Sequence, residues 1–326
     1  MRDRRSSRSS VTAMVAVMGA LLVVMSGCAE LGVEVSAEED GNGGGPSSQY
    51  ESPNIGTMRL VPAGTYQRDQ TPTNITEVSA FYMSRHTITQ AQYEAVTGKA
   101  NPSSFSSGED APNRPVETVS WYDALVFSNM LSLAEGRTPV YTIDGSTDPA
   151  DWGEVPTGPN ETWNAAIMNA DANGYRLPTE AEWLWAAMGA TLDARDGAFD
   201  ESGVNRTGYT KGYAGSSEDG ISNENVGDYA WYTDNSGGTT QPVGRKLPNE
   251  LGLYDMSGNV WEWTWDNFGS YDPGTLIDPT GPISGTMRSL RGGVWNASAS
   301  MSSFSARSGT NPSNRSNTNG LRVVFR

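Results

Sequence analysis

The stretch Gly252-Leu253-Tyr254-Asp255-Met256-Ser257-Gly258-Asn259-Val260-Trp261-Glu262-Trp263 carries the most fold information in this chain. Its two carboxylates, Asp255 and Glu262, stand seven residues apart across a bend that contains glycine. Carboxylates so placed can converge on one hard cation through oxygen ligands. The alternative is that Glu262 caps a backbone turn while the tryptophans pack in a core. The motif therefore indicates either a metal loop or a tightly packed turn.

The overall composition excludes several classes of function. The 326 residues include 37 Gly, 18 Pro and 10 Trp, which favours one large, turn-rich domain with leader material. A single Cys and a single His leave no internal disulfide, no Cys/His zinc site and no Ser-His or Cys-His couple. The net charge of -16 argues against nucleic acid, because it offers no basic stripe to phosphates.

Local signals place the main elements around this motif. We expect strands at 58–66, broken by a turn, and at 78–83. Capping signals predict three helices, at 93–97, 121–133 and 183–188, each preceded by Ser or Thr. Residues 190–326 have few helical periods, and loops of this length usually serve a function or hold a metal. We therefore expect one α+β domain with few helices and much irregular loop.

Several blocks, taken together, resemble a known family. The family motifs match at 81–93, at 114–124, at Tyr175-Arg176-Leu177-Pro178-Thr179-Glu180-Ala181-Glu182-Trp183, at 252–263, at Arg291-Gly292-Gly293 and at Gly320-Leu321-Arg322. In this order they resemble the formylglycine-generating-enzyme-like domain, a variant of the C-type lectin fold. The resemblance covers 57–326 and implies that fold for the whole of this range.

The resemblance also sets expectations about chemistry. The family enzyme uses two cysteines after the Gly-Gly motif, but 295–307 has none, and Ser302 is the nearest analogue. A hydroxyl cannot replace thiolate or copper chemistry, and iron-dependent relatives need several histidines where this chain has only His86. We therefore expect no enzyme activity, no copper and no nucleotide, and we assign His86 a structural role. The family's loop implies calcium bound by Asp255, the Gly258 and Val260 carbonyls, and Glu262.

The last thirty-six residues combine linker-like composition with ordered ends. In 296–320, 20 of 25 residues are Ser, Asn, Ala, Thr or Gly, as in a flexible linker. The segment is nevertheless followed by an apolar run, and a chain end is ordered only when it pairs or packs. We therefore interpret it as an ordered loop system whose side chains matter little to the fold.

This segment resembles the variable region of diversity-generating retroelement target proteins, among them treponemal surface lipoproteins. The spacing Trp295-x16-Pro312-x2-Arg315 matches, and 296–319 contains no Lys, Gln or Glu, residues that such diversification cannot produce. Met301 does not fit. The resemblance implies a fixed frame of Ala299, Ser302, Arg307, Pro312, Arg315 and Gly320. It implies the following ligand-binding positions: Asn296, Ala297, Ser298, Ser300, Phe304, Ala306, Ser308, Gly309, Thr310, Asn311, Ser316, Asn317 and Thr318. The alternative is a polar loop that only solvates one side of the domain.

The N-terminus reads as a leader and an anchor. Arg2 to Arg8 supply a positive region, 11–24 an apolar stretch, and Met25-Ser26-Gly27-Cys28 resembles the lipobox of bacterial lipoproteins. We expect cleavage of the signal peptide 1–27, lipidation of Cys28, and a flexible tether at 28–56. The alternative is an ordinary secretory leader in which Cys28 is incidental.

The combined hypothesis is a monomeric lipoprotein on the outer membrane of a bacterium. It would reach the membrane through its lipid alone and bind a protein or glycan ligand through a variable region at 295–319. The competing hypothesis is a fixed-sequence, non-catalytic scaffold of the envelope.

Overall fold

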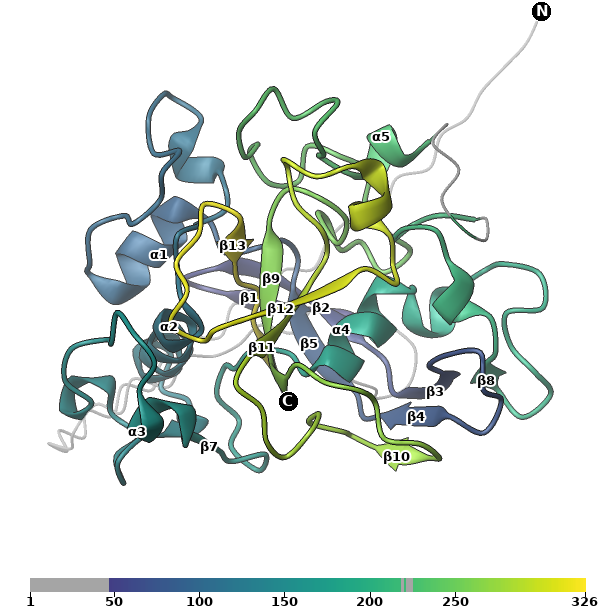
Figure 1. The fold of residues 1–326 in the computed structure, drawn as a ribbon, viewed down its shortest axis with the longest axis horizontal. Helices are drawn as coiled ribbons and strands as arrows, with labels where there is room; N and C mark the ends of the chain where they lie inside the picture. Colours follow the sequence, from purple (N-terminus) through teal and green to yellow (C-terminus); the bar gives the residue numbers. More distant parts are fainter. Residues whose placement is uncertain (1–46, 218–219, 221–224) are drawn as a thin grey trace, which may run out of the picture. The chain divides into compact units, whose positions relative to one another are not determined.

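A computed structural model describes residues 47–217, 220 and 225–326 (Figure 1). The predicted signal peptide, Cys28 and most of the predicted tether lie outside the described residues. Among the described helices, none combines the length and apolarity that a membrane crossing requires. The described chain contains five α-helices and fourteen short strands, in agreement with an α+β fold rich in loops.

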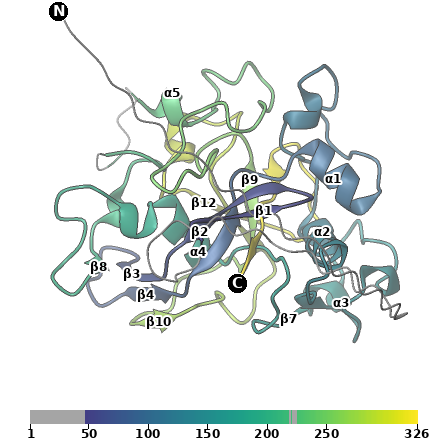
Figure 2. The ribbon, with the colours of Figure 1, turned by 180° about the vertical axis from the view of Figure 1, so that it is seen from behind.

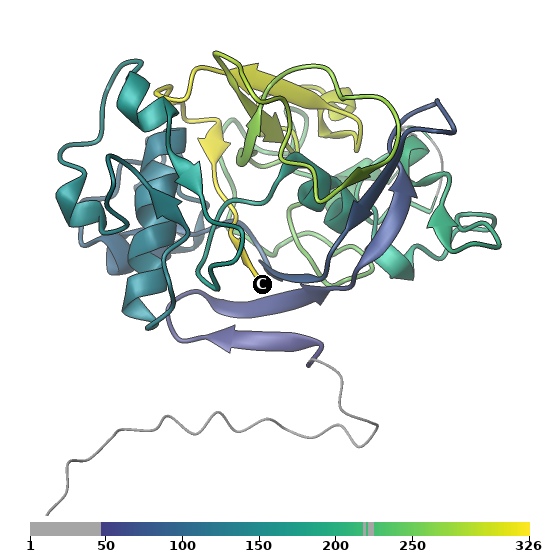
Figure 3. The same cartoon turned by 90° about the horizontal axis from the view of Figure 1, so that it is seen from below.

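The first sheet joins the two ends of the domain. Its order is β1-β2-β5-β14, with β1 at Gln49–Ser52, β2 at Gly56–Val61, β5 at Phe81–Ser84 and β14 at Val324–Phe325. Figure 3 shows β1 and β2 as the outer hairpin of the domain. The predicted tether therefore extended too far, because 49–52 pairs with β2. The ring of Tyr50 also packs 5.1 Å from that of Phe325.

The second sheet has the order β10-β4-β3-β8. Its strands are β10 at Leu276–Ile277, β4 at Ile75–Val78, β3 at Gly64–Gln67 and β8 at Val204–Asn205. The predicted break within 58–66 is confirmed, since β2 ends at Val61 and β3 begins at Gly64. The predicted single strand at 78–83 was wrong, because β4 ends at Val78 and the chain crosses to the first sheet before β5.

The third sheet carries the C-terminal segment. Its order is β12-β11-β9-β13, with β9 at Trp261–Asn267, β11 at Arg288–Arg291, β12 at Arg307–Thr310 and β13 at Asn319–Gly320. A separate pair joins β6 (Tyr141–Thr142) to β7 (Ile167–Met168). β12 therefore forms one edge of the third sheet, and the long segment between β11 and β13 leaves from and returns to that sheet.

The three longer helices begin directly after the predicted cap residues, so α1 and α4 start three residues before the predicted bounds of 93 and 183. α1 (Gln90–Thr97), α2 (Trp121–Ala134) and α4 (Glu180–Ala187) follow Thr89, Ser120 and Thr179, whose side chains accept the third backbone N–H of each helix. The short helices are α3 (Glu161–Asn164) and α5 (Val226–Tyr229). Reciprocal capping uses residues three apart in sequence, which explains why these starts were predictable.

Two buried clusters hold the sheets and helices together. One surrounds α2 and includes Trp121, Phe127 and Trp263. The other surrounds α4 and includes Trp183, Trp185 and Tyr66, whose ring stacks 5.7 Å from that of Trp185. α4 contacts β4, β9 and β11, and so lies between the second and third sheets (Figure 2). Its N-terminus thereby reaches the strands that border the variable segment.

Candidate ligand-binding surface

The frame of the C-terminal segment rests on a buried carboxylate at the start of α4. Glu180 is 2% exposed and accepts hydrogen bonds from Arg291 Nε at 2.7 Å and from Arg307 Nε at 2.9 Å. A second Arg307 nitrogen reaches the other oxygen at 2.8 Å. Burial raises the pKa of Glu180, but the two guanidinium groups outweigh it, so the pKa lies below the usual range. β11 and β12 are therefore pinned to α4 by charge-assisted hydrogen bonds.

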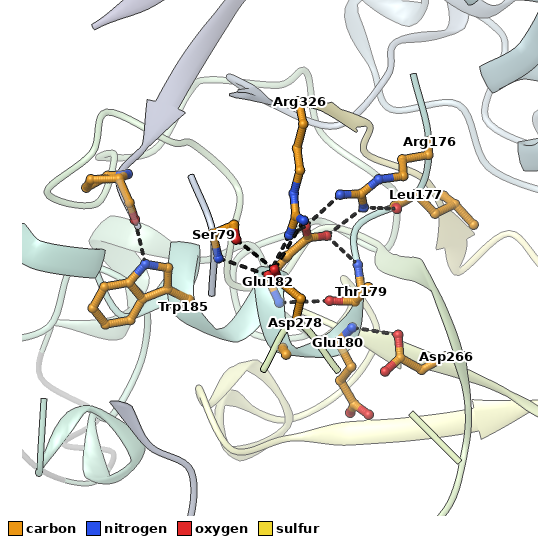
Figure 4. Close-up of polar contacts among 12 residues, drawn as sticks. Ser79, Arg176, Leu177, Thr179, Glu180, Glu182, Trp185, Asp266, Asp278 and Arg326 are labelled. Carbon is orange, nitrogen blue, oxygen red and sulfur yellow. Dashed lines mark hydrogen bonds and ion pairs between the residues drawn. The ribbon is translucent and has the colours of Figure 1, made fainter. Parts of the chain in front are cut away.

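Glu182, two residues further along α4, holds the chain that follows the variable segment. Glu182 pairs with Arg176 at 2.6 Å and with Arg326 at 2.9 Å, and Arg326 also reaches Asp278 at 2.6 Å (Figure 4). The same carboxylate accepts the Thr179 N–H at 2.9 Å as part of the capping box. The α4 N-terminus thus ties together both flanks of the variable segment.

Two further arginines complete this frame. Arg315 donates to both oxygens of Asp123, at 2.8 and 3.2 Å, and Asp123 belongs to the capping box of α2. Arg322 is fully buried and pairs with fully buried Glu262, with the shortest contact at 2.9 Å. The predicted frame roles of Arg307 and Arg315 are therefore confirmed in their geometry. Their partners Glu180 and Asp123 were missed, since helix-capping signals do not identify partners far away in sequence.

The backbone of the segment is also held by fixed residues. The carbonyl oxygens of Ala297, Pro312 and Ser316 accept N–H groups from Thr233, Trp121 and Thr118 at 2.9–3.0 Å. The Asn317 carbonyl accepts the Trp295 indole N–H at 3.0 Å, and the ring of Trp295 meets that of Phe105 edge to face at 5.2 Å. Nothing in the sequence identified Phe105. The path of the segment thus depends on its carbonyls and its arginines, and not on the side chains of the predicted contact positions.

The side chains of the predicted contact positions behave differently. In the described part of the chain, their side-chain hydrogen bonds stay within 296–319 and join residues at most two apart, as in the Ser298–Ser300 hydroxyl pair at 2.8 Å. Asn296, Ser298 and Ser300 are exposed. The remaining positions apart from Phe304 are half-buried: Ala297, Ala306, Ser308, Gly309, Thr310, Asn311, Ser316, Asn317 and Thr318. In Figure 1 this yellow segment crosses the front of the domain.

Two predicted contact positions need correction. Phe304 is only 4% exposed and packs in the α4 cluster, so its ring cannot serve as a surface anchor. Gly309 lies on the same side of β12 as Arg307, since alternate residues of a strand share a face. A Cβ at Gly309 would lie 2.3 Å from the Phe268 ring, so this position has no room for a ligand-contacting side chain.

The predicted calcium ligands have mixed surroundings. Asp255 is 2% exposed, and its Oδ2 accepts the Gly244 N–H at 2.7 Å, while its buried Oδ1 has no hydrogen-bond partner among the residues that the structure describes. An orphaned buried oxygen fits a cation ligand. Glu262 does not fit in this arrangement, because Arg322 contacts both of its oxygens and the Trp183 indole donates to one at 2.7 Å. The structure gives Glu262 an ion-pair role, whereas calcium at Asp255 stays a prediction.

His86 follows β5 and is half-buried, in keeping with the structural role expected of it. Its Nδ1 lies 2.9 Å from the Thr87 carbonyl oxygen. Burial first, and then the charges of Arg322 and Arg85, lower its pKa despite that hydrogen bond. A ring in these surroundings stays neutral at physiological pH.

Comparison with known proteins identifies the class. Residues 45–326 match the family model of the sulfatase-modifying factor enzyme 1-like domain, so the chain belongs to this formylglycine-generating-enzyme-like family. It is 33% identical in sequence to the solved structure of Treponema denticola variable protein 1, with a TM-score of 0.72 over 85% of this chain and 98% of that one. This likeness supports the variant of the C-type lectin fold found in variable proteins.

Two relatives connect the chain to different activities. It is 37% identical over 271 residues to the chaperone protein LppX of Paenibacillus barcinonensis, covering 81% of this chain and 88% of that protein. It is 38% identical over 143 residues to the formylglycine-generating enzyme of Thermomonospora curvata, covering 40% of this chain and 42% of the enzyme. The family is therefore shown, and the activity has to be argued from the site.

Proposed function

We propose that this protein is a lipid-anchored surface protein that binds its ligand through the outward side chains of 296–318. The supporting observation is that different groups of that segment fix its backbone and form its outer surface. Arginines and backbone carbonyls fix its course, while the side chains of the contact positions form hydrogen bonds, among the described residues, only with neighbours at most two positions away. A surface that tolerates many sequences needs a backbone held by other residues. The revised contact set omits Phe304 and Gly309.

The proposal includes the absence of catalysis. The whole sequence has one cysteine, at position 28, so no pair of thiols can follow the Gly-Gly motif at Gly292-Gly293. Ser302, at the nearest position to a family cysteine, is buried, and within the described part of the chain its hydroxyl has no hydrogen-bond partner. A peptide assay for cysteine oxidation with added copper is expected to show no turnover, and measurable formylglycine would overturn this part.

A library experiment tests the binding proposal. One library randomises Asn296, Ser298, Ser300, Ser308 and Thr310. The control library randomises buried Ser302 and Phe304 together with half-buried Gly309, where a Cβ would meet the Phe268 ring. We expect most members of the first library to be displayed folded and to yield binders to an unrelated target protein. The control library should lose display, because overpacking a core is destabilising. Equal loss of folded display in both libraries would contradict the proposal.

The genome offers an independent test of diversification. We expect a near-identical copy of the DNA segment that codes for 295–320, lying near a reverse transcriptase gene. The two copies should differ only at adenines of the template. Its absence would leave a fixed-sequence binding surface or an envelope scaffold.

A second candidate function is favoured by one observation. The similarity to a protein named as a chaperone, over 81% of this chain and 88% of that protein, suggests binding of non-native polypeptides. An aggregation assay distinguishes the chaperone function from selective ligand binding. A chemically unfolded model protein is diluted in the presence of this protein, and a chaperone at stoichiometric amounts lowers the light scattering from its aggregates. A single selective ligand and no effect on scattering would favour the first proposal.

The anchor and the metal are separate parts of the proposal. Replacing Cys28→Ala is expected to move the protein from the detergent-phase membrane fraction to the soluble fraction, because a lipid supplies the attachment. An unchanged fraction would overturn the anchor. For calcium, the supporting feature is the unpartnered Asp255 oxygen, and the test is the pH experiment described in the Discussion.

A further inference from the structure

A cavity of about 230 Å³ lies beneath the loop that carries β10. Leu184 on α4, Leu276 on β10, Pro279 and Pro282 line its apolar side together with the rings of Tyr66 and Tyr271. None of its lining residues belongs to 296–318. An apolar cavity of about 150 Å³ can hold a benzene molecule, so this one has room for a single ring with a short side group.

The cavity also contains an acid with unused hydrogen-bonding capacity. Asp266, on β9, is 3% exposed and accepts the Glu180 N–H through Oδ2 at 2.8 Å (Figure 4). No hydrogen bond from the described chain reaches its Oδ1, which packs against Gly281, another lining residue. A Cβ at Gly281 would lie 2.8 Å from Oδ1, so glycine keeps this side of the carboxyl group free of a protein side chain.

Asp266 differs from the buried acids of the frame because no Lys or Arg among the described residues forms an ion pair with it. Glu180, Glu182 and Glu262 each pair with an arginine at 2.6–2.9 Å. The nearby Arg288 donates instead to the carbonyls of Trp265 and Asn164, at 2.8 and 3.1 Å.

Arg68, at the far side of the cavity, is likewise committed to backbone carbonyls, with contacts to Ile75, Asp272 and Gly274 at 2.5–2.6 Å. Neither arginine therefore neutralises Asp266, and a cation bound in the cavity could pair with it. Burial, followed by repulsion from Glu180, raises the pKa of Asp266 well above its ordinary value.

We propose that this cavity binds a small primary amine with an apolar body about one ring in size, its ammonium group paired with Asp266. The ring would lie among Leu184, Tyr66 and Tyr271, and aromatic faces also attract cations. Asp272, exposed at the rim, and the chain's net charge of -16 favour a cation over an anion. This site goes beyond the surface proposed for 296–318 and does not depend on it.

Binding has a defined proton balance. The amine enters as an ammonium ion, the protonated Asp266 releases its proton to the buffer, and the ammonium–carboxylate pair remains in the cavity. The charged groups around Asp266 are Glu180 and Glu182 on α4 and Arg288 on β11, while Arg68, Tyr271 and Asp272 line the same cavity. Affinity is therefore expected to rise with pH across the range in which Asp266 loses its proton.

Calorimetry on the whole protein tests this proposal, with benzylamine as the probe and benzyl alcohol and benzoate as isosteric controls. We expect benzylamine to bind at least about tenfold more tightly than either control, equivalent to about 1.4 kcal/mol. Repeating the titration in buffers with different ionisation enthalpies should reveal release of up to one proton.

Two variants complete the test. Asp266→Asn should lose the preference for the amine and the proton release, and Thr280→Trp, at the exposed rim, should block entry without altering the core. The triple variant N296A/S298A/S300A should bind benzylamine as the wild type does. No binding by folded protein, equal binding of benzyl alcohol, or an unchanged Asp266→Asn titration would each overturn the proposal.

Discussion

The C-terminal thirty-six residues contain two kinds of position that contrast sharply although they alternate along one chain. Arg291, Arg307, Arg315 and Arg322 reach inward to acids on α4, α2 and β9. Asn296, Ser298 and Ser300 point outward and touch little beyond their neighbours. Removing an inward partner would leave a buried charge uncompensated, whereas changing an outward residue leaves the fold nearly as it was. Stability and recognition are therefore carried by different side chains of the same segment.

The largest effect is expected at Arg322. Arg322→Met leaves Glu262 buried without a counter-charge, and breaking a buried pair in this way costs about 3–5 kcal/mol. Urea unfolding of both proteins measures the loss. The double variant E262Q/R322M is expected to recover part of it, because the uncompensated charge is gone. A loss below about 1 kcal/mol in the single variant would show that the frame does not depend on this pair.

Asp255 is the acid of the 252–263 motif that has no cationic partner among the described residues, and its titration provides the next test. Burial first, and then Glu262, raise its pKa from the ordinary 3.8 to about 6, which corresponds to about 3 kcal/mol. The protonated form is favoured in the folded state, so this contribution is present below about pH 4 and is lost as pH rises through about 6.

In chelator, the wild type should therefore lose more stability than Asp255→Asn between pH 4 and pH 7. Melting temperatures across this range measure the difference, and added calcium should restore wild-type stability at pH 7 if the cation binds there. The same pH dependence in both proteins would argue against an ionising Asp255, and no response to calcium would argue against the metal.

Gly309 tests the boundary between the two kinds of position. Gly309→Val places atoms where the Phe268 ring lies, and overpacking of this kind costs about 1–3 kcal/mol. Thr310→Val, the neighbour on the other side of β12, is the matched control and should change stability by less than about 0.5 kcal/mol. Equal stabilities for the two variants would place Gly309 back among the contact positions.

The smallest effect is expected on the outward surface. N296A/S298A/S300A should shift the free energy of unfolding by less than about 0.5 kcal/mol, as surface substitutions generally do. The same variant should weaken ligand binding once a ligand is found. A loss above about 2 kcal/mol would show that these side chains support the loop after all.

The features that the sequence predicted correctly depend on local rules. Helix starts at Thr89, Ser120 and Thr179 followed from reciprocal caps three residues apart, and the frame arginines followed from family spacing. Phe304 and Gly309 were misplaced because their environment comes from Gly212, the α4 cluster and Phe268, none of which is near in sequence. β1 was missed for another reason: it forms a local hairpin with β2, but its polar sequence, Gln49–Ser52, carries no apolar strand pattern. Composition cannot distinguish an ordered polar loop from a linker when tertiary contacts alone decide.

The pairing of β14 with β5 has a consequence for how the protein is made. Residues 324–325 complete a sheet begun by 49–61, and Arg322 neutralises Glu262, so the sheet stays open until residues 322–325 have been synthesised. Contacts of such long sequence separation form slowly. A chain interrupted anywhere within the variable segment lacks β14 and at least two arginines, Arg322 and Arg326, and so cannot close this sheet or neutralise Glu262.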